Sequence, residues 1–318
     1  MLSNNPKLNG YLIISTGALL MGFADILIKK LLDGGISMFD LVAIRDILGF
    51  FFLLAGIAMV APKTLRISRS DFLFTITYGL LGVASLHLLG IWSVKINSVS
   101  IAIVLLYTSP VFILLWTLIS QREPVKKHEL ITVVVVITGI TLAFQVLDPV
   151  RFRFNRPGLL VGILAAVAFA FSTLWGKRGL PRLHPLTLSV YGMGTAALFW
   201  LLSGLPLRFL TSGQSVETWF YLGLVALLGT LFMPVFYLMG LRTISAAEGN
   251  LTASLEQVYA MGLSVLLLKE HLETIQFVGL ALVVAGVTYL QVKGLKTAPI
   301  TSASIYPETR RGNEQRNL

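Results

Sequence analysis

The chain of 318 residues contains no cysteine and few charged residues. Only 13% of its residues are Asp, Glu, Lys or Arg, whereas soluble domains contain about 25%. The absence of cysteine excludes disulfide bonds. The four histidines are scattered and form neither His-x-x-Glu-His nor His-Glu-x-x-His, and the chain has no GxxxxGK[ST] phosphate-binding loop. We therefore expect no metal, no cofactor, no catalytic residues and no step driven by ATP, so the chain is not expected to be an enzyme.

Long apolar runs dominate what is present. Hydrophobic residues make up 55% of the chain, and the mean hydropathy is +0.81. Runs of about 18–22 apolar residues can cross the ~30 Å hydrocarbon core of a membrane as helices. Such runs predict an all-α integral membrane protein with ten transmembrane helices, at residues 11–31, 39–61, 72–92, 99–119, 130–147, 158–177, 186–205, 218–239, 246–267 and 274–292.

The net charge of +10 comes from basic residues in the short segments between the apolar runs. This distribution fits the positive-inside rule of membrane proteins better than nucleic-acid binding. It favours an orientation with both termini cytoplasmic, although Arg151, Arg153 and Arg156 lie on the side expected to be external. Residues 294–318 are polar and basic, and we expect a disordered cytoplasmic tail.

The two halves of the chain resemble each other. A shift of 148 aligns Gly10 with Gly158 and Lys29 with Lys177, and a shift of 147 aligns Glu123 with Glu270. The predicted repeats cover residues 9–147 and 156–293, with five spans each. Because five is odd, the second repeat enters the membrane upside down relative to the first. Inverted repeats of this kind are typical of transporters that open a site at the bilayer midplane to alternate sides.

A small-residue helix recurs in both halves as "SVSIAIVLLYTSPVFILLWTLISQREP" and "SAAEGNLTASLEQVYAMGLSVLLLKEHL". An acidic residue, a short polar link and a final span with "GI-T" or "GV-T" follow each copy. In this order the chain resembles the EamA-type transporters of the drug/metabolite transporter (DMT) superfamily. The resemblance implies a ten-helix, multi-pass carrier of small metabolites, amino acids or drugs in a bacterial plasma (inner) membrane. The chain departs from the family where Glu256 is followed by Gln257 instead of proline, which makes a symmetric pair of kinked helices doubtful.

The ninth expected span carries polar residues on one helical face. Glu248, Thr252 and Glu256 recur at every fourth position, and Tyr259 continues that face. We expect this stripe to line a central cavity, with Glu256 binding a solute cation or titrating a coupled proton. Alternatively, Glu256 pairs with a buried basic residue or is protonated and structural. Glu248, near the expected cytoplasmic end, is expected to be solvated.

Prolines interrupt two other spans. Pro110 follows Tyr107 and Ser109 in the fourth span, and Pro234 lies in the eighth. A proline inside a helix frees a backbone carbonyl, which in a membrane must be satisfied or face a wet cavity. Tyr107 and Ser109 therefore either contact the solute or belong to a kinked packing helix, and Pro110 and Pro234 are candidate kinks or gates.

Charged residues also occur in the first two spans. Asp25 lies well inside the first, and Arg45 lies in the second. An ion pair of Arg45 with Asp25 or with Glu256 would satisfy buried charge, either as a structural pair or on the solute pathway. His87 in the third span either forms a hydrogen bond between helices or relays a proton. Trp92 and Trp175 are candidate cavity walls.

These observations predict a secondary transporter that moves a small metabolite, an amino acid or a similar zwitterion or cation, by alternating access. Export is favoured by the family resemblance. The expected partners are the solute and membrane lipid, without nucleic acid, and the expected state is a monomer or homodimer. A membrane-embedded lipid-modifying enzyme and a non-transporting sensor or partner subunit are the alternatives.

Overall fold

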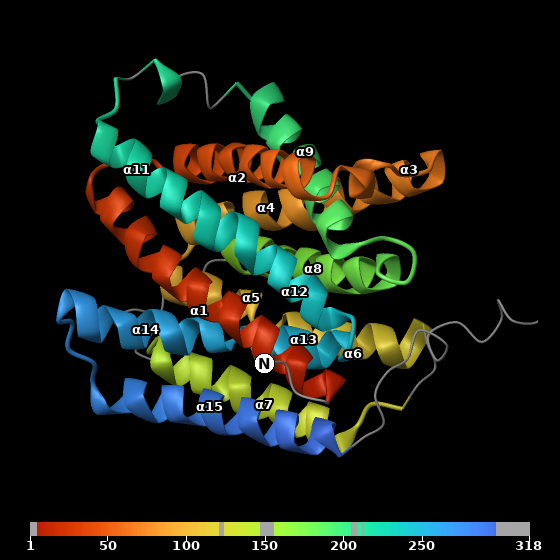
Figure 1. The fold of residues 1–318 in the computed structure, drawn as a ribbon. Helices are drawn as coiled ribbons and strands as arrows, with labels where there is room; N and C mark the ends of the chain where they lie inside the picture. The colour runs from red at the N-terminus through yellow and green to blue at the C-terminus, as the bar shows by residue number, and fades with distance from the viewer. Residues whose placement is uncertain (1–4, 121–123, 147–155, 205–208, 212, 297–318) are drawn as a thin grey trace, which may run out of the picture.

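The computed structural model describes residues 5–120, 124–146, 156–204, 209–211 and 213–296, which are almost entirely helical (Figure 1). The helices of the described part are α1 (Pro6–Asp33), α2 (Met38–Val60), η1 (Pro62–Leu65), α3 (Arg69–Thr77), η2 (Tyr78–Ala84), α4 (Ser85–Ile96), α5 (Val99–Leu106), α6 (Ser109–Ser120), α7 (Lys127–Ala143), α8 (Arg156–Gly179), α9 (Pro185–Leu202), α11 (Val216–Val225), η3 (Ala226–Phe232), α12 (Met233–Leu241), α13 (Ala246–Ala253), α14 (Leu255–Leu268) and α15 (Thr274–Leu295).

Nine helical segments of the described residues are long and apolar enough to cross a membrane. They coincide with nine of the ten expected spans. The other expected span falls on α7, which has 17 residues and is about 26 Å long at about 1.5 Å per residue. The count of ten therefore stays a prediction. Helix α15 continues to Leu295, and residues 297–318 of the expected tail lie outside the described residues.

Short polar side chains define where several helices begin. Asn5, Ser37, Ser98, Ser215 and Ser245 each stand before a helix and accept a hydrogen bond from a backbone N–H of its first turn. The first N–H groups of a helix have no intrahelical partner, so each cap contributes about 1 kcal/mol. These caps separate the long apolar runs into individual helices.

Two kinds of irregularity recur in both halves of the chain. The third and eighth expected spans each contain a stretch of π-helix, η2 and η3, and these stretches coincide under the shift of 148. The fourth and ninth spans are each broken in the middle, between α5 and α6 and between α13 and α14. Because the shared positions include backbone irregularities as well as residue types, the likeness of the halves extends to local structure.

Helices of the first half of the chain also pack against helices of the second half. Helix α7 runs along α15 at one edge of the bundle, α1 packs against α12 and α14, and α8 packs against α4, α5 and α6 (Figure 1). Helix α2 packs against α9. Glycines let α7 and α15 approach closely, since a Cβ on Gly139 would lie 2.7 Å from the carbonyl oxygen of Gly279. The orientation of the helices in a membrane, and therefore the inversion, stays a prediction.

Candidate functional site

Three charged side chains of distant helices form one electrostatic group, Asp25 of α1, Arg45 of α2 and Glu256 of α14. Asp25 interacts with Arg45, and Glu256 interacts with both. Protein surrounds both carboxyl groups, yet all three residues are partly accessible instead of fully buried. We call these residues the charged triad. With two carboxylates and one guanidinium ionised, the triad carries one net negative charge.

A break in the ninth expected span positions Glu256. Helix α13 ends at Ala253, so Glu256 lies in the first turn of α14, where the helix dipole favours a carboxylate. Near the break, Thr252 Oγ1 donates to the Glu248 carbonyl oxygen (2.7 Å) and Ser254 Oγ to that of Leu251 (2.7 Å). Such hydroxyl bonds to the preceding turn bend helices. The ninth span is thus interrupted without a proline, and both halves of the chain contain an interrupted helix despite the missing proline.

The direct partner of Arg45 differs from both of those expected. Within the described residues, its ion pair below 4.0 Å joins Nε to Oδ1 of the adjacent Asp46, at 3.7 Å. Neither Asp25 nor Glu256 lies within this distance of Arg45. The reason is local, because Asp46 belongs to the same helix and is itself fixed by two other side chains. His87 Nδ1 lies 2.6 Å from Asp46 Oδ2, and Trp200 Nε1 donates to the same oxygen at 2.8 Å.

The two broken helices contact each other through polar side chains. Tyr107 ends α5, and its hydroxyl oxygen lies 3.4 Å from Gln257 Nε2. The same nitrogen donates to Glu256 Oε1 at 3.1 Å, which connects the break to the charged triad. Ser109 Oγ donates to Asn250 Oδ1 at 2.9 Å, and both residues are fully buried. Tyr107 and Ser109 therefore connect the two halves of the chain.

Sequence reasoning missed Asn250, which joins four helices. Its Nδ2 donates to Thr173 Oγ1 at 3.4 Å, and the Thr173 and Tyr237 hydroxyls lie 2.8 Å apart. An amide in an apolar span is costly unless it is hydrogen-bonded, and this cost could have marked Asn250 as a residue with polar partners. The stripe assigned from four-residue spacing does not contain Asn250.

Other predicted residues bond to their own helix, pack against a neighbouring helix or stand near the start of a helix. Thr252 is fully buried and bonds to its own helix. Tyr259 is partly accessible, and its backbone packs against Gly22 of α1. Pro110 and Pro234 each occupy the second position of a helix, α6 and α12, after a break and a π-helical stretch respectively. Pro110 thus stands near the start of a helix, where the missing N–H costs little, whereas Pro234 follows the π-helical stretch within one continuous helical segment.

The two tryptophans differ in their surroundings. Trp175 lies in an aromatic stack, with Phe74 and Phe171 rings at 5.2 Å and 5.1 Å. Trp92 is 47% exposed. None of the contacts described for either ring reaches the charged triad, so the structure supplies no direct support for their placement at the site.

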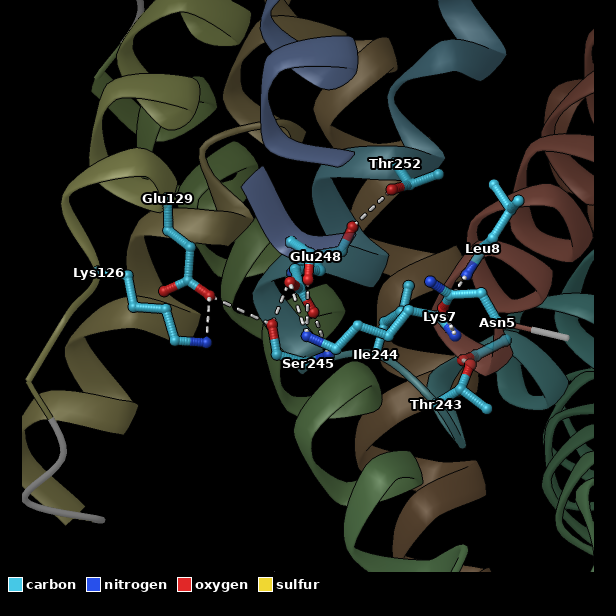
Figure 2. A network of polar contacts seen from close by, with 12 residues as sticks. Asn5, Lys7, Leu8, Lys126, Glu129, Thr243, Ile244, Ser245, Glu248 and Thr252 are labelled. Atoms are coloured by element: carbon cyan, nitrogen blue, oxygen red, sulfur yellow. Dashed lines mark hydrogen bonds and ion pairs between the residues drawn. The ribbon is translucent and has the colours of Figure 1, made fainter. Parts of the chain in front are cut away.

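A second charged cluster joins the ends of several helices (Figure 2). Lys7 Nζ lies 3.9 Å from Glu248 Oε1 and donates to the Gly294 carbonyl oxygen at 3.0 Å. Lys7 is 2% exposed and Glu248 is fully buried. Glu248 also accepts from the backbone N–H of Ser245 at 2.7 Å. The expectation of a solvated Glu248 is therefore wrong, because the ends of α1 and α15 cover the start of α13.

The same cluster extends to α7 and α8. Glu129 Oε1 accepts from Ser245 Oγ at 3.3 Å and lies 3.8 Å from Lys126 Nζ (Figure 2). Lys177 Nζ donates to the carbonyl oxygens of Leu241 and Ile244 at 2.5 Å and 2.6 Å. We call Lys7, Glu129, Lys177, Ser245 and Glu248 the ionic latch. Its residues lie at the ends of α1, α7, α8 and α13, and they contact the ends of α12 and α15.

One group within this cluster has the composition of a metal site. Ligand atoms of His128, Glu129 and Glu248 lie within 4.8 Å of one another. However, the ammonium groups of Lys7 and Lys126 lie next to these two carboxylates. Because the ammonium groups already balance the carboxylates, the arrangement fits an ion-pair network better than a cation site.

The other end of α1 carries more exposed ion pairs. Lys29 pairs with Glu270, which follows α14, and both side chains are more than a third exposed. The hydrogen bond from Lys29 lowers the pKa of the Glu270 carboxyl. Lys29 and Lys177 are aligned in the two halves, but only Lys177 lies in a covered cluster. The expected repeat mate of Glu270, Glu123, lies outside the described residues.

Comparisons with known proteins agree with this architecture. The model of the EamA-like transporter family matches residues 8–145 and 156–292. The "Uncharacterized transporter YetK" of Bacillus subtilis is 22% identical over 297 residues, with 90% of this chain and 88% of the relative covered. An "Uncharacterized transporter" of Archaeoglobus fulgidus is 27% identical over 276 residues, with 84% and 94% covered.

A solved crystal structure shares the fold. The match has a TM-score of 0.74 at 17% identity and covers 92% of this chain and 100% of the other. The family matches span both halves and most of the chain. The chain therefore belongs to the EamA-like transporter family of the drug/metabolite transporter superfamily, and it is a multi-pass membrane protein.

Proposed function

We propose that the chain is a secondary transporter of a small zwitterionic or cationic metabolite, with amino acids as the first candidates. The charged triad carries this proposal. Asp25 and Glu256 come from different halves of the chain, and both stay partly accessible although protein surrounds them. Ionisable side chains inside membrane spans are costly and usually mark a solute or ion pathway.

The composition of the triad supports a zwitterionic solute. The two carboxylates can bind a solute ammonium group, and the Arg45 guanidinium can bind a solute carboxylate in a bidentate manner. With one net negative charge in the ionised state, the site disfavours anions. Protonation of Asp25 or Glu256 would change its charge, which offers a route for coupling to a proton gradient.

Alternating access is the mechanism that the rest of the structure supports. The ionic latch covers one end of the bundle with buried charges, whereas the Lys29–Glu270 pair at the other end of α1 is exposed. The paired helix breaks and π-helical stretches support two five-helix repeats, and so do the two ranges matched by the family. In this proposal the repeats are inverted, with both termini cytoplasmic in a bacterial inner membrane. Export is the favoured direction.

Counterflow in proteoliposomes tests the proposal. The purified chain is reconstituted with an unlabelled amino-acid pool inside, and uptake of each labelled amino acid is followed with and without a pH gradient. We expect saturable exchange of at least one zwitterionic or cationic solute. No exchange by protein that remains folded, across amino acids, amines and related zwitterions, would refute the carrier function.

Substitution of the triad then identifies the site. Glu256→Gln is expected to abolish the pH dependence of transport with little loss of thermal stability, because the side chain is partly accessible. Asp33→Asn is the matched control, since it removes an exposed carboxylate at the end of α1. An equal loss of folding and transport in Glu256→Gln would assign Glu256 a structural role instead.

A further inference from the structure

Asp46 is the buried polar group in the second expected span that the proposed transport cycle does not use. It is 1% exposed and lies next to the Arg45 of the charged triad. A buried carboxylate is costly unless donors surround it. The side chains around Asp46 therefore show which groups fix its carboxylate and which group the carboxylate positions in turn.

The two oxygens of Asp46 have different partners. Oδ2 accepts a hydrogen bond from Trp200 Nε1 of α9 at 2.8 Å and lies 2.6 Å from His87 Nδ1 of α4. An indole N–H is a donor only, and His87 completes the contact when Nδ1 carries its proton. Among the described residues, Oδ1 has no hydrogen-bond partner and lies 3.7 Å from Arg45 Nε, which also has none there. Side chains of two other helices thus fix one carboxylate, whose remaining oxygen faces the guanidinium.

The position of Arg45 follows from this arrangement. Its charge interacts with Asp25 and Glu256, yet its nearest carboxylate is Asp46. A long arginine side chain loses considerable rotamer entropy when it is held in one place, so a fixed neighbouring charge reduces the cost of ordering it before the solute arrives. An Arg45 released from Asp46 would sample other rotamers, so its guanidinium would less often stand where a solute carboxylate can bind it.

We propose that Asp46, fixed by His87 and Trp200, is a positioning residue that keeps the Arg45 guanidinium available for the carboxylate of a zwitterionic solute. This inference rests on the proposed transport function and specifies how one side of the site is built. Asp46 itself does not touch the solute. The inference predicts that Asp46 contributes to the recognition of the solute carboxylate and not to that of the amine.

The transport test compares two solutes. For Asp46→Asn, which keeps the shape of the side chain, KM for a transported zwitterionic amino acid is expected to rise at least about ten-fold, with kcat within about three-fold of wild type. KM for the corresponding amine without a carboxylate is expected to change less than about three-fold. Trp200→Phe, which keeps an aromatic ring but removes the donor, is expected to show a smaller change in the same direction. Asp33→Asn is the matched control.

Equal effects of Asp46→Asn on both solutes, or no effect on either, would overturn the inference while leaving the transport function intact. A measurement independent of transport covers the case in which no solute is found. In ¹⁵N-labelled protein, the Arg45 Nε–H resonance, assigned by its loss in Arg45→Lys, is expected to exchange with water more slowly in wild type than in Asp46→Asn. Equal exchange in the two proteins would overturn the positioning role whatever the solute.

Discussion

The contact between Lys7 and Glu248 in the ionic latch leads to a quantitative prediction about the closed end of the bundle. The two charges lie 3.9 Å apart with 2% and 0% of their side chains exposed. At an effective dielectric constant of about 20, charges at this distance attract by about 4 kcal/mol. Removing one partner of a buried pair typically costs about 3–5 kcal/mol, because the other charge stays buried.

Glu248→Gln should therefore lower the free energy of unfolding by about 3 kcal/mol. The amide can still accept the Ser245 backbone N–H, so this value lies at the lower end of the range. Lys7→Met should also destabilise the protein. The double variant should lose less than the sum of the two, with a coupling energy of about 2 kcal/mol or more.

The assay is a double-mutant cycle from reversible unfolding in one detergent. The matched control is the cycle of Lys29→Met and Glu270→Gln at the other end of α1, where both side chains are exposed. Exposed ion pairs contribute about 0–1 kcal/mol. A Lys7–Glu248 coupling no larger than the control coupling would refute the reasoning that burial makes this contact strong.

A labelling experiment connects the same contact to access. The chain has no cysteine, so Thr252→Cys introduces a sole thiol one turn after Glu248 in a fully buried position. In otherwise wild-type protein a water-soluble thiol reagent should modify it slowly. Addition of Glu248→Gln should accelerate modification several-fold, since the weakened latch opens more often. Unchanged modification in a folded variant would show that the latch does not control access to this end.

Three further outcomes are expected. Gly139→Ala should lower the melting temperature because its Cβ would meet the Gly279 carbonyl at 2.7 Å, whereas Gly56→Ala, with open space around it, should not. Asn250→Leu should cost about 1–3 kcal/mol, because it leaves buried hydroxyl partners unsatisfied, and chemical denaturation measures this loss. Burial, and secondarily a nearby arginine, lowers the pKa of His184, whose Nδ1 accepts the Leu186 N–H as a helix cap. The stability from this neutral cap is therefore complete above about pH 6.5 and is lost as the pH falls through the lowered pKa, so the melting-temperature difference from His184→Asn, a non-titrating cap, should change over that window.

The helical architecture could be predicted from the sequence because one physical length controls it. Apolar runs must match the thickness of the hydrocarbon core, and in lipid each backbone polar group must be satisfied within its helix. Nine expected spans correspond to helical segments of that kind. Serine and asparagine residues cap the first turns of several helices, and such caps can be recognised from neighbouring residues alone.

Only one of the two helix interruptions could be predicted from the sequence. Pro110 indicated the interruption of the fourth span, but the ninth is interrupted without proline. There the hydroxyls of Thr252 and Ser254 bond to the preceding turn. Serine and threonine make the same bonds in uninterrupted helices, so residue type does not distinguish the two outcomes.

The sequence by itself determined the membrane class, the approximate position of the helices and the candidacy of Asp25, Arg45 and Glu256 as charges in apolar spans. Only the tertiary structure decided their partners. It placed Asp46 beside Arg45, joined Asn250 to Ser109, and buried Glu248 beneath the ends of α1 and α15. The physical reason is that hydropathy depends on one segment at a time, whereas the burial of a polar group depends on which distant helices cover it and what donors they bring.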